Sequence, residues 1–183
     1  MKDGGSPMNE HIFHRLYDDY HSDVFHFLIY MLKDRATAED LSHEVYIRAI
    51  KAYERFENKS SEKTWLFAIA KNVAIDHFRK QKVRSQYAFD FFDWESEQLI
   101  AIDKSPEEIS IGNEENVQLY RALDECSGDQ KTVIILRYIQ QLSIAETAKI
   151  LEWSESKVKT TQHRAIKQLK LLMAQNESEA KLG

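Results

Sequence analysis

The sequence has few residues that interrupt regular secondary structure. It contains five glycines and two prolines in 183 residues, and only Gly112, Gly128 and Pro106 lie away from the ends. β-Sandwiches, Rossmann folds and glycine-lined phosphate sites need more of these residues at their turns. The composition therefore favours an all-α protein, and the length suits one or two small domains.

Cysteine is nearly absent, because Cys126 is the single thiol. One thiol excludes an intramolecular disulfide framework and a multi-cysteine zinc site, and we expect a small buried thiol of an intracellular protein. The sequence also lacks an apolar run of membrane-spanning length and a signal-peptide pattern, so we expect a cytoplasmic protein. Residues 1–7, ahead of Met8, resemble a cloning remnant and are left out of the fold prediction.

The net charge of −5 argues, taken alone, against a nucleic-acid partner. Its distribution changes that interpretation. Residues 8–82 hold 12 basic and 12 acidic side chains, residues 83–113 hold 2 and 7, and residues 114–176 hold 9 and 8. The acidity belongs to the middle segment, and the two flanking segments are nearly neutral.

The first flanking segment has apolar residues at helical spacing throughout. The second of its predicted helices starts at Thr37, where a hydroxyl followed by Asp40 three residues later fits a capping box. A polar break at residues 58–61 precedes the third helix. The predicted helices span about residues 9–31, 37–56 and 62–82.

The middle segment, residues 83–113, loses this period and combines aromatic with acidic residues. We predict a linker there, with one more poorly patterned helix as the alternative. Beyond it, capping boxes begin at Ser127 and Ser143, and Ser154 caps a third helix that reaches about Met173. The short helix from Ser143, the turn at residues 151–153 and the longer helix match a helix-turn-helix in length and order.

The last helix has one apolar and one basic face. At 100° per residue, Val158, Ala165 and Leu169 share the core face, while Lys159, His163 and Lys167 lie opposite with Thr160 beside them. A second helix with such a face suits the major groove of DNA, where its N-terminal half reaches base edges. The alternative is a solvated lysine face.

The helix at residues 62–82 carries Trp65, Asn72, Asp76 and Arg79 on one stripe. An aromatic ring, an amide and cations beside a polar loop could form a platform for single-stranded nucleic acid. The alternative places Trp65 in the core and pairs Asp76 with Arg79 or Lys80 on the same helix.

The helix at residues 37–56 has an outer stripe of Asp40, Glu44, Ile47 and Lys51. An isoleucine within a charged stripe is a hint of a protein interface. Elsewhere the histidines of the first helix lack a second cluster that would complete a metal site, and no pairing of nucleophile and base stands out. We therefore expect no metal, no cofactor and no catalytic residue, and the protein is not expected to be an enzyme.

Three segments in this order resemble the extracytoplasmic-function (ECF) sigma factors of the sigma-70 family. Residues 38–49, AEDLSHEVYIRA, resemble the helix that binds core RNA polymerase. Residues 64–80, TWLFAIAKNVAIDHFRK, resemble the segment that melts the promoter and recognises the minus-ten element, and the helix-turn-helix resembles the minus-thirty-five reader. The resemblance covers nearly everything after Met8. It is strongest to the sigma-X type, through SSEKTWL at residues 60–66 and SESKVKTTQHR at residues 154–164.

The resemblance implies a role for each face. Core polymerase would be bound by Asp40, Leu41, Glu44, Ile47, Arg48 and Lys51. The minus-ten strand would be held by Lys59, Ser60, Lys63, Trp65, Asn72, Arg79 and Lys80. The minus-thirty-five duplex would be read by Lys157, Lys159, Thr160, His163, Arg164 and Lys167. Glu152 departs from the family pattern at a turn position where glycine is common, and Thr161 and Gln162 replace a more usual arginine and apolar residue.

The resemblance also implies partners and boundaries. The expected partners are core RNA polymerase, promoter DNA and an anti-sigma factor, which in this family is often membrane-anchored. No small-molecule substrate is expected. The genes under its control are expected to respond to envelope stress. Residues 8–84 form a region 2-like domain, 85–116 an acidic linker, 117–176 a region 4-like domain and 177–183 a tail. The acidic linker could imitate a phosphate backbone or serve solubility alone. The rivals are a stand-alone helix-turn-helix regulator and an enzyme built on the histidine-rich first helix.

Overall fold

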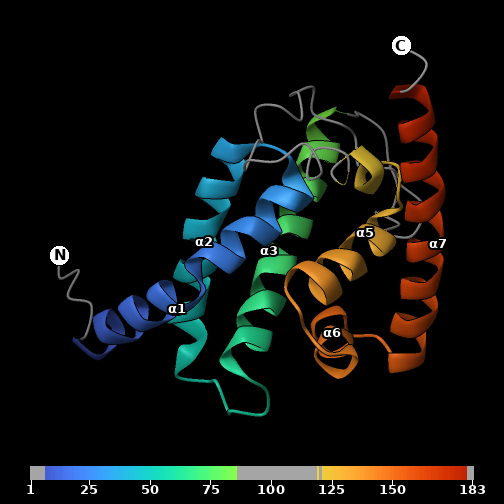
Figure 1. Ribbon diagram of the computed structural model, residues 1–183. Coiled ribbons are helices and arrows are strands. Elements are labelled where there is room, and N and C mark those ends of the chain that lie inside the picture. The colour runs from blue at the N-terminus through green and yellow to red at the C-terminus, as the bar shows by residue number, and fades with distance from the viewer. Residues whose placement is uncertain (1–6, 86–118, 120, 181–183) are drawn as a thin grey trace.

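The computed structural model describes residues 7–85, 119 and 121–180. These residues form helices and no strand, which confirms the all-α prediction. The helices, in chain order, are α1 (Pro7–Leu32), α2 (Arg35–Tyr53), α3 (Glu62–Ser85), α5 (Gly128–Ile134), the π-helix η2 (Ile135–Ile139), α6 (Ile144–Leu151) and α7 (Glu155–Ala180) (Figure 1). The predicted acidic linker lies outside the described residues, except for Ser85 at the end of α3.

The start of α2 differs from the prediction. Asp34, and not Thr37, is its N-cap: Oδ2 of Asp34 accepts hydrogen bonds from the backbone N–H of Thr37 at 3.2 Å and from its hydroxyl at 2.5 Å. An aspartate is as good a cap as a threonine, and the two patterns overlap in this sequence. The helix also ends at Tyr53, before the predicted end at about Phe56, and α1 includes Pro7 from the segment that was set aside.

The predicted helix starts in the second half are confirmed. Ser127 and Ser143 each form a complete capping box, with Gln130 and Glu146 as the reciprocal partners. The hydroxyl of Ser154 accepts from the N–H of Lys157 at 3.1 Å at the start of α7. Two features were not predicted: α5 continues into the π-helix η2, and α7 runs beyond Met173 to Ala180.

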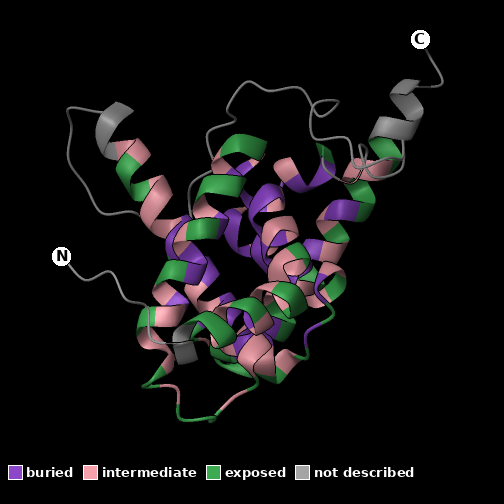
Figure 2. Cartoon of the chain, turned by 90° about the vertical axis from the view of Figure 1, so that its left-hand side faces the viewer, coloured by how far each residue is buried: buried purple, intermediate pink, exposed green. Residues whose placement is uncertain are grey.

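The first three helices bury a common apolar core. α1 packs against α2 and α3, and α2 packs against α3. Leu16, Phe27, Tyr46 and Phe67 are buried in one apolar cluster of these helices. Figure 2 shows the buried residues in purple on the helices. The inward-facing stripes of the helices account for this packing, because each helix has apolar residues at helical spacing.

The helix-turn-helix forms as predicted from α6 and α7. Glu152 ends α6 in the left-handed region, at φ 59° and ψ 37°, and its N–H together with that of Trp153 satisfies the last carbonyl groups of the helix. This conformation favours glycine, and a glutamate adopts it at a cost of about 1 kcal/mol. On α7, Val158, Ala165 and Leu169 are buried, which confirms the predicted core face.

The two halves of the chain pack against each other. α3 contacts α1 and α2 on one side and α6 on the other, and Figure 1 shows α5, α6 and α7 on the far side of α3 from α2. One apolar cluster continues across the boundary, from Leu66 and Phe67 of α3 to Leu142, Ile150 and Leu151 of the second half. The relative packing of the halves, which the sequence left open, is therefore close in this structure.

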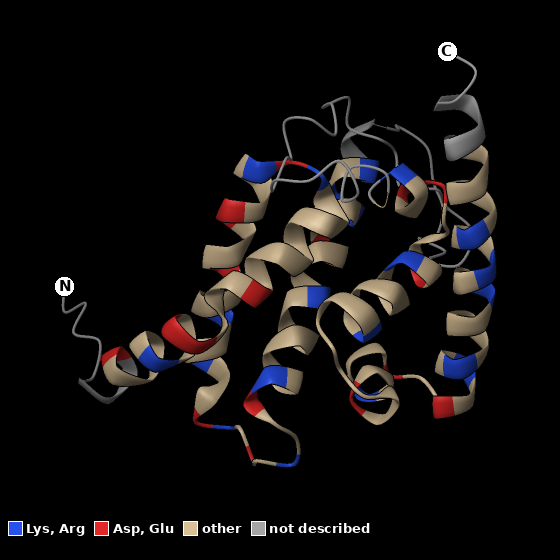
Figure 3. Ribbon diagram, viewed as in Figure 1, with Lys and Arg blue, Asp and Glu red and all other residues tan. Residues whose placement is uncertain are grey.

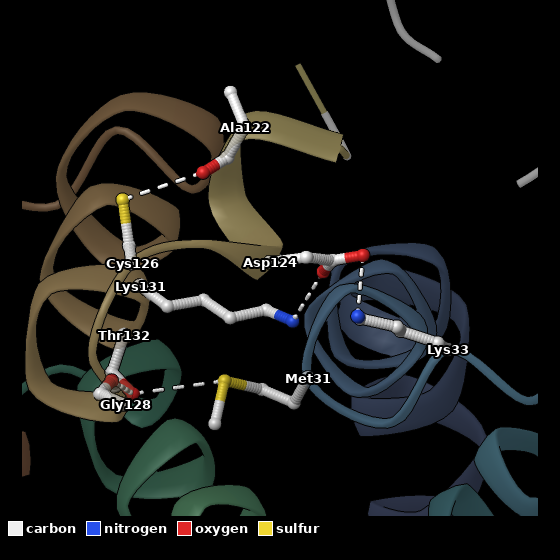
Figure 4. Close-up of polar contacts among 8 residues, drawn as sticks. All are labelled: Met31, Lys33, Ala122, Asp124, Cys126, Gly128, Lys131 and Thr132. Atoms are coloured by element: carbon white, nitrogen blue, oxygen red, sulfur yellow. Dashed lines mark hydrogen bonds and ion pairs between the residues drawn. The ribbon is translucent and has the colours of Figure 1, made fainter. Parts of the chain in front are cut away.

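A shared carboxylate joins the halves at the end of α1. Asp124, in the helical turn before α5, pairs with Lys33 of the first half and with Nζ of Lys131 at 3.2 Å (Figure 4). The side chain of Lys131 is 2% exposed, and burial lowers its pKa to about 8 although Asp124 opposes the change. Thr132 adds a contact of its hydroxyl with Sδ of Met31 at 3.6 Å. We call Lys33, Asp124 and Lys131 the carboxylate clasp.

Candidate nucleic-acid and polymerase interfaces

The basic face of α7 is open to solvent. Lys159, Thr160, His163, Arg164 and Lys167 are exposed. Figure 3 shows lysine and arginine recurring along this helix. Lys159 lies 4.0 Å from Glu155 on the same helix, and both side chains are more than half exposed. An exposed pair of this kind contributes little to stability, so the cations of this face are available to an anionic partner.

Lys157 differs from the rest of the predicted minus-thirty-five set. Its ammonium lies 4.0 Å from the ring centre of Trp153 in the turn of the helix-turn-helix, and the residue is half-buried. A cation over an indole face is attracted by the quadrupole of the ring. Lys157 therefore braces the turn against α7 and keeps its charge at the N-terminal end of the basic face.

Gln162 does not face outward with these cations. It is half-buried, its Oε1 accepts from Nε of Arg137 at 2.9 Å, and its Nε2 donates to the hydroxyl of Tyr138 at 3.0 Å. Arg137 also donates to the carbonyl of Leu142. Arg137 and Tyr138 on the π-helix thus satisfy the polar side chain of Gln162, which stands where the family pattern has an apolar residue. They lie 24 and 25 residues away in the chain, so the sequence could not indicate them.

The loop between α2 and α3, residues 54–61, has a polar anchor at its base. Arg15 of α1 donates to both carboxylate oxygens of Glu62, at 2.5 and 2.7 Å, and Tyr53 donates to the same carboxylate at 2.7 Å. The hydrogen bond from Arg15 lowers the pKa of Glu62. A bidentate arginine–carboxylate pair has a fixed geometry, so the two ends of the loop are held at a set separation. No pattern in the sequence indicated this anchor.

The second half of the chain contacts the first turn of α3, directly after this loop, where Lys63 also pairs with Asp23 of α1. Nζ of Lys63 lies 2.8 Å from Oδ2 of Asp23 and 3.3 Å from the carbonyl of Gln140, and the hydroxyl of Thr64 donates to Glu146 at 3.3 Å. Beside these contacts lies a polar cavity of about 430 Å³, lined by Asp23, Lys63, Ile139, Gln140, Gln141, Leu142 and Glu146.

Lys149 of α6 adds one more contact, from its Nζ to the carbonyl of Lys59 at 3.3 Å. The second half of the chain therefore engages the ammonium of Lys63 and the backbone carbonyl of Lys59, while the side chain of Lys59 is 83% exposed. We call the contacts made by Lys59, Lys63 and Thr64 with that half the loop contacts.

The rest of the predicted minus-ten set is spread along α3. Asn72, Arg79 and Lys80 are exposed, and Ser60 is half-buried in the loop. Trp65 is half-buried against the apolar core, with its ring centre 4.8 Å from that of Phe56. Trp65 therefore packs against the core, as the alternative interpretation of its position predicted, and part of its side chain stays accessible to solvent.

Lys71 departs from the pattern of exposed cations on α3. It is 8% exposed, and burial lowers its pKa. Asp76 pairs with Arg48 of α2 at 2.8 Å, a partner that the sequence did not indicate. The accessible cations of α3 are therefore those near its C-terminal end.

The predicted polymerase stripe of α2 is a largely exposed surface. Asp40 and Lys51 are exposed, Leu41 and Glu44 are half-buried, and Ile47 is 46% exposed. Arg48 holds this surface on α3, because its guanidinium donates to Glu44 and to Asp76, each at 2.8 Å. An apolar side chain is thus displayed inside a charged and braced stripe.

Metal-binding clusters are absent from the part of the chain that the structure describes: no three histidine, cysteine, aspartate or glutamate side chains gather there so that they could hold an ion. Among the same residues no helix is both long and apolar enough to cross a membrane.

Comparisons with known proteins agree on one family. Residues 16–84 match the family described as Sigma-70 region 2, and residues 116–169 match Sigma-70, region 4. The chain is 52% identical over 161 residues to the ECF RNA polymerase sigma factor SigX of Bacillus subtilis, covering 88% of this chain and 83% of that one. It is 30% identical to the RNA polymerase sigma factor YlaC of the same organism, over 91% and 95% of the two chains.

Two solved structures share the fold. The sigma factor RpoE from Bartonella quintana, in complex with the anti-sigma factor NepR, superposes with a TM-score of 0.70 at 24% identity and covers 88% of this chain and 96% of that one. CnrH, in complex with the cytosolic domain of CnrY, gives 0.65 at 18% identity over 90% and 89%. At these identities the likeness shows the fold alone.

Proposed function

The chain belongs to the ECF sigma factors of the sigma-70 family, and we propose how its surfaces divide the work of starting transcription. As a sigma factor of this group it binds core RNA polymerase and directs promoter recognition and transcription initiation. The single observation that supports the division of work is the exposed cationic face of α7, presented by the second helix of a helix-turn-helix. We assign residues 8–84 and 117–176 as the two functional domains and 85–116 as their linker.

We propose that α7 reads the upstream promoter element as duplex DNA. Lys159, Thr160, His163 and Arg164 would approach base edges in the major groove, because they lie in the N-terminal half of the second helix. Lys157 and Lys167 would meet phosphates on either side and set the register.

The loop before α3 and the outer face of α3 would capture the opened non-template strand. Lys59, Ser60 and Lys63 would hold backbone and an extruded base, and Trp65, Asn72, Arg79 and Lys80 would continue the path along α3. Removing a base from the stack costs about a few kcal/mol, which contacts to polymerase and to the strand must offset. The second half holds the ammonium of Lys63 but only the backbone carbonyl of Lys59, so we expect strand capture at Lys63 to improve when the helix-turn-helix half moves away.

The stripe of Asp40, Leu41, Glu44, Ile47, Arg48 and Lys51 would dock on core polymerase. Ile47→Glu is expected to reduce polymerase affinity by about tenfold or more, because a charge replaces an apolar contact at the centre of the interface. A pull-down with core polymerase measures this effect. His14→Glu, which adds the same charge at an exposed position of α1, is the matched control and should be retained in full. Full retention of Ile47→Glu on polymerase would remove this assignment.

We further propose an anti-sigma factor as the inhibitory partner, in the cytoplasm where polymerase acts. The support is family membership and the fold shared with the sigma factor RpoE, whose structure contains the anti-sigma factor NepR. Catalysis belongs to the polymerase, so this chain supplies no catalytic group. The envelope-stress regulon stays a prediction.

Transcription in vitro with core polymerase and a promoter library tests the proposed function. Transcripts that depend on this chain, and that share an upstream and a minus-ten sequence, are the expected result. Sequence-specific duplex binding without polymerase, and no dependent transcript, would favour the stand-alone regulator. The match of residues 16–84 to Sigma-70 region 2 argues against that rival, because a stand-alone regulator has no use for a polymerase-binding domain.

A further inference from the structure

Tyr138 is an exposed aromatic residue to which the proposed function gives no role. It lies on the π-helix η2, directly before the helix-turn-helix, and is 51% exposed. The backbone bond from Gln140 N–H to the carbonyl of Ile135 spans five residues, which places one extra residue in this turn. Such turns occur often at functional sites. The extra residue turns the side chains beyond it to directions that a regular helix would not give them.

A directed set of hydrogen bonds fixes the hydroxyl of Tyr138. The guanidinium of Arg137 can only donate, so the oxygen of the Gln162 amide faces it at 2.9 Å. The amide nitrogen, which can only donate, then faces the hydroxyl of Tyr138 at 3.0 Å. The hydroxyl oxygen therefore accepts from this amide, which leaves its own proton for another acceptor, and the 51% exposure of Tyr138 lets a bound molecule be that acceptor.

The position of Gln162 places that proton beside the basic face of α7. Gln162 comes three residues after Lys159, and side chains three apart are neighbours on a helix. Phosphates border the groove into which a reading helix docks, and their oxygens accept hydrogen bonds from tyrosine as well as from cations. A neutral donor at the edge of a cationic face is suited to a phosphate and carries no charge of its own.

We propose that Tyr138 donates a hydrogen bond to a phosphate oxygen of the upstream promoter duplex, with Gln162 and Arg137 as positioning residues. The inference rests on the proposed function of α7. It explains why a polar side chain stands at position 162, where the family pattern has an apolar one: the glutamine orients a donor located outside the helix-turn-helix.

The test uses the holoenzyme of core polymerase and the full chain on a promoter duplex taken from the library experiment. Tyr138→Phe is expected to lower affinity by about tenfold, the effect of a hydrogen bond to a charged group. The slope of log affinity against log salt should not change, because no cation is lost. Lys159→Ala should instead make that slope shallower by about one. Tyr20→Phe, which removes the hydroxyl of a half-buried tyrosine on α1, should bind as the unmodified chain.

Single methylphosphonate substitutions in the upstream duplex then locate the contact. At one substituted phosphate the affinity of the unmodified chain should fall by about tenfold, while the affinity of Tyr138→Phe should not fall further. Gln162→Leu should show part of this loss of affinity. The double variant Tyr138→Phe with Gln162→Leu should lose no more affinity than Tyr138→Phe alone, because the two residues act in one chain of hydrogen bonds.

Equal sensitivity of Tyr138→Phe and the unmodified chain at every phosphate would overturn the inference, as would unchanged affinity. Additive losses in the double variant would overturn the positioning role of Gln162. If the unmodified chain does not direct polymerase to any promoter, the proposed function fails instead, and the two failures are distinguishable.

Discussion

The two surfaces proposed to read DNA differ in what surrounds them. The basic face of α7 stands on a single long helix whose start is fixed by a local cap, and its cations are exposed to solvent. The loop before α3 is anchored at its base by Arg15, Tyr53 and Glu62. The other half of the chain touches the carbonyl of Lys59 in this loop, and it touches Lys63 and Thr64 in the first turn of α3. The first surface is accessible in this structure, and the second is partly covered by the other half of the chain.

The difference has a physical reason. A helix face is built from residues a few positions apart, so it forms wherever the helix forms. A loop has no internal ladder of hydrogen bonds and leaves polar groups that neighbouring segments can satisfy. The proposed duplex reading therefore starts from a face that is already exposed, whereas the proposed strand capture depends on how firmly the two halves hold each other.

A substitution in the carboxylate clasp is expected to have the largest effect on stability. Asp124→Ala leaves the buried ammonium of Lys131 without this carboxylate, and we expect the free energy of unfolding to fall by about 3 kcal/mol. The halves should also separate, because Lys33 loses the same partner. Urea unfolding measures the first effect and small-angle scattering the second. Glu125→Ala, at the exposed neighbouring carboxylate, is the matched control and should change neither.

The basic face should respond without any change in packing. Lys159→Ala or His163→Ala is expected to weaken recognition of the upstream element by about tenfold, since one base or phosphate contact is lost. Binding to core polymerase and the unfolding midpoint should stay as they are, because both side chains are exposed. Promoter-library transcription measures selection. Unchanged selection in both variants would show that the reading face lies elsewhere.

The clasp should also give stability a pH dependence. Lys131 has its pKa lowered to about 8 in the folded chain from 10.5, so above pH 8 the unfolded chain binds more protons and stability rises with pH. We expect a gain of about 1 kcal/mol between pH 8 and 9. Burial raises the pKa of Cys126 from 9.0 to about 11, which opposes this gain increasingly as the pH passes 9 and sets the upper end of the window.

Lys131→Met should remove the gain between pH 8 and 9, because methionine cannot titrate and has a similar length. Urea unfolding at each pH measures it. A rise that persists in Lys131→Met would assign the titration to another group.

The loop contacts should give the smallest effect. Thr64→Val keeps the shape of a buried side chain and removes a hydroxyl that donates to Glu146 in the other half and also bonds Oγ of Ser61 at 2.8 Å. Only the weak bond to Glu146 joins the two halves, and it is worth about 0.5 to 1 kcal/mol, so the free chain should bind a minus-ten-strand oligonucleotide about threefold more tightly. Fluorescence anisotropy measures this binding.

Thr147→Val is the matched control for the loop contacts. It makes the same substitution at a buried threonine of α6 whose hydroxyl has no hydrogen-bond partner among the described residues. The control should bind the oligonucleotide as the unmodified chain does. Equal binding by Thr64→Val and the unmodified chain would show that the loop is open already.

Much of the fold was predictable because its signals are local. The capping boxes at Ser127 and Ser143, the cap at Ser154 and the apolar stripe through Val158 depend on residues within a turn or two of each other. Where two local signals overlapped, as at Asp34 and Thr37, the wrong one was chosen. The π-helix was missed because an extra residue in one turn leaves no periodic pattern in so short a segment.

For the candidate sites, too, the local features were predicted and the features that depend on distant contacts were not. The exposed character of Lys159, His163 and Ile47 follows from helical periodicity and was predicted. The burial of Lys71 and the pairing of Asp76 with Arg48 were not, because each depends on a segment far away in the chain.

Local spacing and family motifs were enough to indicate that this protein is helical, that its halves are a Sigma-70 region 2 segment and a helix-turn-helix, and that one helix face is basic. These properties depend on residues three or four positions apart in the sequence, so no distant contact is needed to infer them. The packed chain was needed to show that Asp124 joins the halves, that Gln162 contacts Tyr138 and that Glu146 accepts from Thr64 at the start of α3. The last two contacts join residues 24 and 82 positions apart, and only folding brings such residues within hydrogen-bonding distance.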